Sequence, residues 1–312
     1  MMTMKKSLLA LSVASLPMAA SADLQPMNEQ DMGNVTGQQG VTIELSTAAT
    51  IDQVEYSQST ADADTGSVLM NGIRIGGHDE GESLDIDVNV DLITENDDLG
   101  RSPYGYPATP VEDGDAYISV RNLGNQPAPV QAGVDMDSLG IASSDGDSSA
   151  TLISNFTADF WVTRLDITAR VNNQIANGNP DTGSIRIRNV FHADIGADFD
   201  VAAVSIPSIR MAGADQLENL KGAEGDLNRA TLAINGVTVN AEVGAGPAIS
   251  TNAGIDGAPD ETLRVDINEL TTSIWMPTVN VGSGDGTTAS IGNVGISNLS
   301  IADTQMAIYG RE

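Results

Sequence analysis

Two copies of the tetrapeptide Asp-Thr-Gly-Ser are the residues most suggestive of catalysis, and they begin at Asp64 and Asp181. Paired carboxylates that share one proton are the machinery of aspartic proteolysis. That chemistry needs each aspartate to be delivered by a buried apolar strand, whereas Asp64 follows Asp62-Ala63 and Asp181 follows Asn179-Pro180. Asp and Gly are also typical turn residues. The sequence therefore favours exposed turns before strands over a catalytic pair.

The sequence offers few candidates for catalysis or metal binding by histidine, because the chain contains only His78 and His192. A Ser-His-Asp triad needs an activated serine beside a histidine base. His78 lies in the acidic loop Gly76 to Glu82, His192 falls on the polar face of a strand, and no Gly-x-Ser-x-Gly elbow is present. We interpret both as surface histidines, and two histidines do not predict a zinc site. With no cysteine, thiolate metal sites and thiol nucleophiles are excluded.

Calcium is the one cofactor whose binding the sequence leaves as a weak possibility. Asn177 to Gly183 has oxygen-bearing side chains at alternate positions, as calcium loops do, but Arg188 stands where such a loop would have its bidentate Glu. Gly282 to Gly286 is a single Gly-Asp run without the tandem copies of calcium-bound β-helices. Turn chemistry is the favoured interpretation of both. No P-loop or dinucleotide fingerprint occurs, so the sequence assigns no catalytic, cofactor-binding or metal residue.

The elements that carry these residues are β-strands, because apolar and polar residues alternate along most of the chain. Apolar residues occupy the even positions from Leu84 to Leu92, and three aspartates and an asparagine occupy the odd ones. Odd positions from Ile185 to Ala203 continue one apolar face. An unbroken strand of that length would span about 60 Å, so either this strand bends or the protein is elongated. We expect the acidic faces to point outward and to discourage indiscriminate stacking.

The apolar phase slips at several places, which indicates β-bulges. One extra residue near Thr163-Arg164 would explain the slip between Phe156–Val162 and Leu165–Val171. An apolar-x-Asn-apolar unit recurs, and Asn tolerates the left-handed backbone that some bulges need. We interpret the unit as a repeated bulged strand, suited to a long sandwich, a curved sheet or a solenoid. Its copies contain Asn71, Asn122, Asn189 and Asn298, with a looser copy at Asn235.

The chain divides into three predicted regions. Residues 1–22 have the pattern of a cleavable signal peptide, with Lys5 and Lys6, a short apolar run and Ala20-Ser21-Ala22. The apolar run is about half of the ~20 residues needed to span a bilayer. Residues 23–40 form a flexible polar segment, and residues 41–312 an all-β region. Loops at 95–110 and 124–149 suggest two halves, 41–124 and 151–312. Between Ala214 and Asn228, glycines limit any helix to one short turn.

Charge and composition exclude several functions. With 14 basic and 43 acidic residues the net charge is −29, and loss of the two signal-peptide lysines makes it −31. Such a chain cannot neutralise phosphates, so nucleic acid is excluded as a partner. No later apolar run is long enough for a transmembrane helix. Acidic surfaces are typical of proteins that work outside the cell, where salt screens their repulsion.

The start of the predicted mature chain carries a family resemblance. The block from Asp23 through Val35-Thr36-Gly37-Gln38 to Val41, followed by a strand, and the closing Ile296-Ser297-Asn298-Leu299 resemble an uncharacterised family of exported Gram-negative proteins. Some of its members are labelled as pilus-system (Fil-type) proteins. The resemblance implies a cell-envelope protein with a part in a pilus or adhesive structure. It carries over no catalytic or binding residues.

These observations predict a non-enzymatic, exported envelope or surface protein with a structural, adhesive or pilus-assembly role. It would associate strand to strand with copies of itself or with a pilus-system partner. The alternative is a binding module that holds lipid or another apolar ligand in the trough of a curved sheet, lined by the Ile185–Ala203 face and Thr262–Val281. Whether the protein stays in the periplasm, reaches the outer-membrane surface or is released stays open.

Overall fold

The computed structural model of the 312-residue chain describes residues 40–57, 66–79, 81–93, 104–106, 111, 113–145, 147–170, 183–222, 229–245, 262–282 and 289–309. The chain divides into two units, residues 1–38 and residues 39–312. The predicted signal peptide and all but the last residue of the predicted flexible segment lie outside the described residues.

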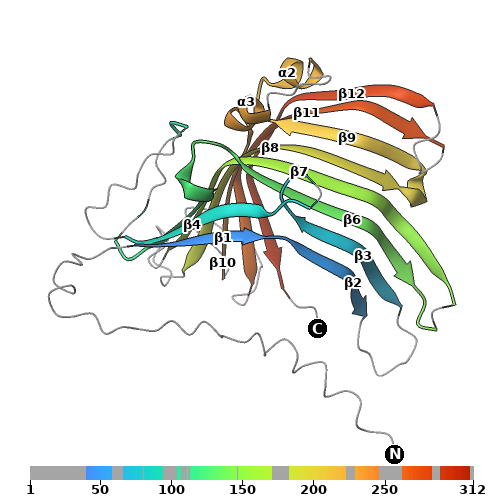
Figure 1. The fold of residues 1–312 in the computed structure, drawn as a ribbon, viewed down its shortest axis with the longest axis horizontal. Helices are drawn as coiled ribbons and strands as arrows, with labels where there is room; N and C mark the ends of the chain where they lie inside the picture. The colour runs from blue at the N-terminus through green and yellow to red at the C-terminus, as the bar shows by residue number, and fades with distance from the viewer. Residues whose placement is uncertain are drawn as a thin grey trace, which may run out of the picture. The chain divides into compact units, whose positions relative to one another are not determined.

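Twelve strands of the second unit form one antiparallel sheet, which confirms the all-β prediction (Figure 1). Two short α-helices and two 3-10 turns, η1 (Leu123–Asn125) and η2 (Asp200–Ala202), are the remaining regular elements of the described chain. The strands are β1 (Gly40–Thr47), β2 (Ala49–Ser57), β3 (Ser67–Gly76), β4 (Leu84–Leu92), β5 (Ala116–Asn122), β6 (Val130–Ala142), β7 (Ser149–Arg170), β8 (Ser184–Phe199), β9 (Val204–Ala212), β10 (Val237–Ala245), β11 (Leu263–Val281) and β12 (Ser290–Ile308).

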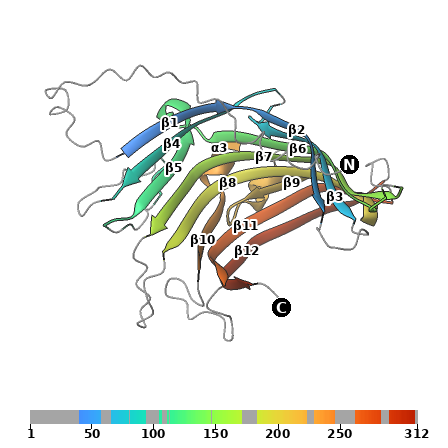
Figure 2. The same ribbon diagram turned by 90° about the horizontal axis from the view of Figure 1, so that it is seen from below.

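The sheet has two halves that share four long strands. In the β1 half the strand order is β1-β4-β5-β7-β8-β10-β11-β12, and in the β2 half it is β2-β3-β6-β7-β8-β9-β11-β12. Strands β7, β8, β11 and β12 run through both halves, and the shorter strands meet at a midline level with Thr163. Figures 1 and 2 show the strands bending as they pass from one half to the other. Strands from both predicted sequence halves belong to this one sheet.

Connections that join a shorter strand of one half to a shorter strand of the other half lie at the midline. The largest is the β9–β10 connector, residues 213–236, which carries α2 (Leu217–Lys221) and α3 (Arg229–Ile234). Helix α3 packs on β7 and β8, and α2 packs on β9, β11 and β12. Both helices lie on the same side of the sheet (Figure 1), which we call the helix face. No helix in the described part of the chain is long and apolar enough to cross a membrane.

The opposite side, which we call the apolar face, is built of cross-strand rows. One row crosses the whole β1 half and contains only one polar residue, Asn189 at its centre. Neighbouring rows begin at Val41 and Leu92 and consist almost entirely of aliphatic residues. The first row reads Ile43, Val88, Val120, Leu165, Asn189, Val239, Leu270 and Ile301.

Burial in the β1 half is the reverse of the sequence-based expectation. Several acidic side chains on the helix face are enclosed: Asp87 and Asp166 are 2% exposed, and Glu242 and Asp266 are 0% exposed. Aliphatic side chains at the margins of the apolar face are open, with Leu92 64% exposed. The prediction that the acidic faces point outward is therefore wrong for these side chains, whereas Glu44, Asp85 and Glu269 of the same half are exposed as expected. Alternation shows that two faces differ, but curvature and covering loops decide which of them is enclosed.

The bulge prediction is confirmed at two places. The β7–β8 register shifts between Val162 and Arg164, which makes Thr163 the extra residue. In β12 the register shifts opposite Asn298, whose φ is 55°. In the copy around Asn71 it is the following Gly72 that has the positive φ, of 62°. The other copies of the repeat show no left-handed asparagine, so a bulged-strand repeat describes only part of the pattern.

Three other boundaries differ from the sequence-based expectation. Strand β8 ends at Phe199, because η2 and the left-handed Ala203 stop it. The predicted short helix is confirmed as α2, but α3 was not predicted. The segment 124–149, predicted as a loop, contains β6. Its Gly133 is needed for close packing, since a Cβ there would lie 2.5 Å from the Gly77 carbonyl oxygen.

Candidate functional site

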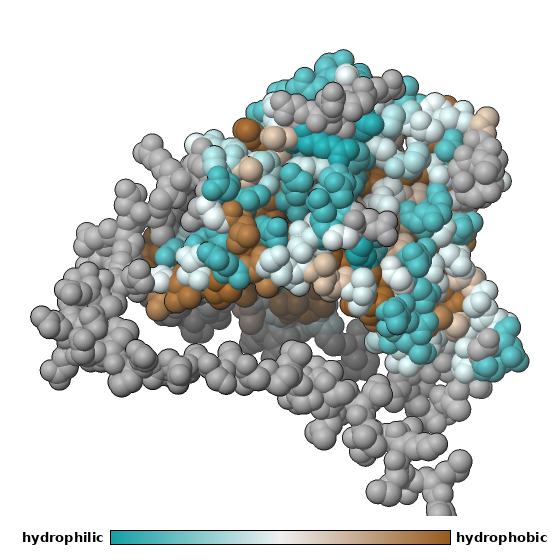
Figure 3. Space-filling view, viewed as in Figure 1, coloured by the Kyte–Doolittle hydropathy of each residue, from teal (hydrophilic) through white to brown (hydrophobic). Residues whose placement is uncertain are grey.

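The first candidate site is the apolar face. Its aliphatic side chains keep much of their surface accessible in the β1 half, and none of the described helices covers them. In Figure 3 hydrophobic residues gather along the lower border of the described chain, in the region of β1 and β4, while hydrophilic residues dominate around the helices. The most exposed members at the strand ends are Val41 63%, Ile43 52%, Leu92 64%, Ile185 47%, Leu263 48%, Met306 44% and Ile308 50%.

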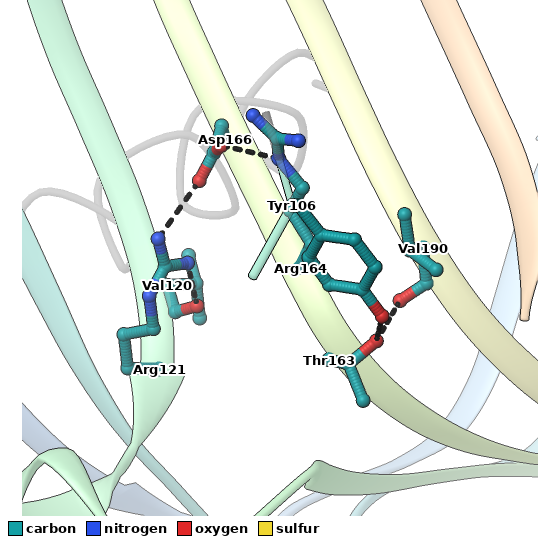
Figure 4. A network of polar contacts seen from close by, with 7 residues as sticks. All are labelled: Tyr106, Val120, Arg121, Thr163, Arg164, Asp166 and Val190. Carbon is teal, nitrogen blue, oxygen red and sulfur yellow. Dashed lines mark hydrogen bonds and ion pairs between the residues drawn. The ribbon is translucent and has the colours of Figure 1, made fainter. Parts of the chain in front are cut away.

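On the helix face, arginines and carboxylates form buried ion pairs between strands. Asp166 of β7 accepts hydrogen bonds from Arg164 (Nε to Oδ2, 2.6 Å) and from Arg121 of β5 (Nη2 to Oδ1, 3.1 Å). Figure 4 shows both guanidinium groups turned toward this carboxylate. Burial raises the pKa of the neighbouring Tyr117 to about 12, and the Asp166 charge acts in the same direction. Tyr117 therefore stays protonated at neutral pH.

Glu242 of β10 is the centre of a second enclosed group. Its carboxylate accepts hydrogen bonds from the Ser184 hydroxyl (2.5 Å) and from Arg186 Nη2 (3.1 Å), and Arg170 Nη1 lies 3.8 Å away. All three partners come from the ends of β7 and β8, which pair with β10 or with each other. A buried carboxylate is tolerated here because cationic and hydroxyl donors surround it.

Polar side chains at the midline hold the β9–β10 connector on the sheet. The Thr163 hydroxyl donates toward the Ala233 carbonyl oxygen at 2.9 Å, and the Tyr106 hydroxyl donates toward the Ile234 carbonyl oxygen at 2.8 Å. The two hydroxyl oxygens lie 2.8 Å apart (Figure 4). Burial raises the pKa of Tyr106, and the Thr163 hydrogen bond and Arg164 oppose that shift. The bulge in β7 thus places Thr163 where it contacts α3.

Both histidines lie at this midline, which corrects their interpretation as surface residues. His192 is 0% exposed, and its Nδ1–H donates to the Met211 carbonyl oxygen at 2.8 Å. Burial lowers the pKa of His192 to about 4, so the ring is neutral at pH 7. The Trp161 ring contacts both imidazoles, with centroid distances of 4.7 Å to His78 and 5.3 Å to His192. The connector covers this polar strand face, which the strand pattern alone does not reveal.

Arg229 of α3 completes this aromatic cluster. Its guanidinium lies 4.3 Å from the Trp161 ring centroid and donates from Nη1 to His78 Nε2 at 3.2 Å. The other imidazole nitrogen, His78 Nδ1, lies 3.0 Å from Asp159 Oδ1. Arg229 thus joins α3 to β7 and to the β3–β4 turn, and the contacts given for the two imidazoles include no serine hydroxyl that could act as a nucleophile in triad chemistry.

The second candidate site is a pocket of about 530 Å³ on the helix face, beside the midline. Strands β7, β8, β10 and β11 form its floor, and the β9–β10 connector forms one wall. The residues with side-chain chemistry are Tyr106, Arg164, Arg188, Asn240, Glu269 and Thr271. Burial lowers the pKa of the Arg188 guanidinium, and Arg164 and Arg186 act in the same direction. It nevertheless stays charged at neutral pH.

The two Asp-Thr-Gly-Ser copies begin strands that are far apart in the sheet. Ser67 aligns through Ala142 with Ser149, at the start of β7, whereas Ser184 pairs with Arg170, at the end of β7. Asp64 and Asp181 themselves lie outside the described residues, as do most of the proposed calcium loops 177–183 and 282–286. Calcium binding there stays a prediction. Within the described ranges, no group of three or more His, Asp or Glu residues is placed to hold a metal ion.

The sequence did contain a signal for the polar rows. Arg164, Asp166, Thr168 and Arg170 alternate along β7, and Arg186 and Arg188 alternate along β8. In a chain with 43 acidic and only 14 basic residues, clustered arginines at strand spacing indicate charge pairing across strands. The pocket could not be predicted, because its walls come from segments separated by more than 100 residues.

Comparison with known proteins adds a partial family match. The family described as "Family of unknown function (DUF6160)" matches residues 1–99, a range that includes β1 to β4. No curated protein and no solved structure matches the chain. Chemical conclusions about this chain therefore have to come from its own residues.

Proposed function

We propose that the chain is a non-enzymatic, exported envelope protein that binds the acyl chains of lipid on its apolar face. The observation that supports this is the set of mainly aliphatic rows on the apolar face, one of which crosses all eight strands of the β1 half with Asn189 as its only polar member. Eight strands at about 4.8 Å spacing and three rows at about 6.7 Å spacing make a surface of roughly 34 Å by 14 Å. Apolar surfaces of that size mark interaction sites on soluble proteins.

The polarity of the two faces explains why an apolar ligand suits this surface. In the β1 half the arginines and several of the carboxylates are enclosed on the helix face, where they form ion pairs such as Arg121–Asp166 and Arg186–Glu242. The row through the middle of the apolar face has Asn189 as its only polar member, and the chain as a whole carries a net charge of −29. That charge repels anionic headgroups, so zwitterionic lipids are the preferred ligands.

The test is lipid recovery from matched variants. The protein is purified from its native host without detergent, and bound lipid is extracted and identified by mass spectrometry. Leu92→Asp puts a charge on the apolar face at a side chain that is already 64% exposed. Val201→Asp puts the same charge on η2 at a side chain that is 72% exposed. We expect lipid with wild type and Val201→Asp and a several-fold loss with Leu92→Asp. Equal recovery from both variants, or none from wild type, contradicts the proposal.

A second candidate function is strand-to-strand assembly, in keeping with the pilus-system resemblance. Among the described strands, β12 has a neighbour on one side only, and so do β1 and β2 at the opposite border. Strand β12 is 19 residues long and almost entirely exposed. Exposed edges of this length are templates for pairing with another chain. The left-handed residues Asn298 and Asp303 interrupt the edge, which favours selective pairing over stacking.

Because the chain has no cysteine, single-cysteine variants give a clean test of edge pairing. Ala302→Cys places a thiol on the exposed edge of β12, and Val201→Cys places one on η2. With a short bis-maleimide on intact cells, we expect Ala302→Cys to give cross-linked dimers or adducts with an envelope partner, and Val201→Cys to give only background. The same low background from both variants would refute edge pairing.

A further inference from the structure

The pocket on the helix face has the chemistry of an anion site, although the chain is strongly acidic. Two of its lining residues, Arg164 and Arg188, are cationic, and Asn240, Thr271 and Tyr106 add neutral hydrogen-bonding groups. Arg164 is committed to Asp166 through the 2.6 Å hydrogen bond from Nε. Arg188 is directly opposite Asp166 in the β7–β8 register. It is the cation of the lining that still has a hydrogen-bond donor left for a ligand.

Arg188 has unmet hydrogen-bonding potential inside the pocket. Its buried Nε has no hydrogen-bond partner, and within the described chain its guanidinium forms no ion pair. Asp166, the carboxylate nearest in the register, already pairs with Arg121 and Arg164. Asp166 and Glu269 act on the Arg188 guanidinium from beyond ion-pair distance, so an anion that enters the pocket gains a direct charge-assisted partner.

Asn240 defines the second requirement of the ligand. It is directly opposite Arg188 in the β8–β10 register, and its buried Oδ1 has no hydrogen-bond partner. An amide oxygen accepts hydrogen bonds only, so the ligand should carry a hydroxyl or N–H group next to its anionic group. Thr271 and Tyr106 are further hydroxyl partners in the lining.

The balance of charge limits the ligand to one negative charge. Glu269 also lines the pocket and is exposed to solvent. Arg188 and Glu269 together give the lining no excess positive charge, so only the part of a ligand next to Arg188 can be anionic, and Glu269 would repel a second negative charge such as that of a phosphate dianion. A monoanion can bind at the Arg188 side while its neutral, hydroxylated part lies toward Asn240 and Glu269. A volume of about 530 Å³ accommodates a molecule of monosaccharide to disaccharide size.

We propose that this pocket binds a small hydroxylated carboxylate, of which an acidic sugar is the chemical type, with Arg188 holding the carboxylate and Asn240 accepting a hydroxyl hydrogen. The site is on the opposite side of the sheet from the apolar face and does not depend on it. Its lining joins the β9–β10 connector, including α3, to four strands, so a bound ligand would also stabilise the midline of the sheet.

Isothermal titration of the purified mature chain tests the proposal with four probes: glucuronate, glucose, acetate and inorganic phosphate. We expect glucuronate to bind more tightly than acetate, because acetate lacks hydroxyls, and glucose and phosphate to give no measurable binding. Arg188→Gln should weaken glucuronate binding at least tenfold. Asn240→Leu, similar in size but without the amide, should weaken glucuronate while leaving acetate unchanged.

Arg210→Gln is the matched control, since Arg210 lies on the same face but outside the pocket, 3.8 Å from Asp194. It should bind glucuronate like wild type. Circular dichroism and urea unfolding check that all three variants fold. Phosphate binding tighter than glucuronate would overturn the choice of a carboxylate. Equal glucuronate affinity in wild type and Arg188→Gln, or no binding of any carboxylate, would overturn the site itself.

Discussion

Replacing one buried carboxylate and one aliphatic residue beside it tests the reversed burial of the β1 half. Glu242 and Ile185 lie on adjacent strands, since Ile185 pairs with Val243. Glu242 is 0% exposed and sits among Ser184, Arg170 and Arg186. Glu242→Gln removes the charge but keeps the size, so two guanidinium groups lose their buried counter-ion. Breaking such a buried pair costs about 3–5 kcal/mol.

Substitution of the aliphatic side chain, Ile185, should lower the free energy of unfolding by less. Full burial of an isoleucine contributes about 2 kcal/mol, and Ile185 is 47% exposed, so Ile185→Asn should cost about 1 kcal/mol. The free energy of unfolding of each variant is measured by urea titration followed by circular dichroism. A conventional sheet with its apolar face inside would give the opposite order. A larger loss of stability in Ile185→Asn than in Glu242→Gln would therefore refute the reversed arrangement.

Three further predictions concern the midline. Asn298 has a φ of 55° and exchanges two 2.6 Å hydrogen bonds with Asp215, so Asn298→Ala should lower the unfolding free energy by about 2 kcal/mol, and Asn298→Gly by less because glycine tolerates the backbone. Thr163→Val, which loses the donor to Ala233, should cost about 2 kcal/mol in the same urea assay, and Thr163→Ser should be milder; equal losses would contradict this. Burial lowers the His192 pKa to about 4, below its unfolded value near 6.5, so the unfolded state binds the extra proton and stability falls by about 3 kcal/mol as pH drops from 6.5 to below 4. His192→Asn should flatten that part of the pH dependence in urea titrations, and an unchanged slope would contradict the assignment.

Alternation in the sequence was sufficient to predict most of the strands but not which of their faces is enclosed. The even apolar positions of β4 and the phase slip at Thr163 follow from side-chain periodicity, which is local, so both were predictable. Which face is enclosed depends on curvature and on the β9–β10 connector, and neither leaves a local signal. Asp87 looked like a solvent-facing residue for this reason, although it is 2% exposed.

Local composition also gave a wrong secondary-structure prediction where contacts between distant segments determine the structure. Strand β6 looked like a loop because it contains glycines and aspartates, yet Asp135 pairs with Arg74 and Gly133 makes room for the β3–β4 turn. The candidate pocket depends on Tyr106 and Ile234, which are 128 residues apart and joined by a hydrogen bond. Such contacts need the register of the whole sheet, which one sequence does not specify.

The concentration of arginines on the enclosed face has a consequence for how copies of the protein meet. Every arginine in the described ranges is buried or half-buried, and Arg264 is 0% exposed. The outer surface is left with acidic groups and very few cations, so two molecules approaching each other present like charges. At 0.01 M ionic strength that repulsion reaches about 30 Å, and at 1 M about 3 Å. The salinity of the surroundings therefore decides whether the edges of β1 and β12 can come within pairing distance of another chain.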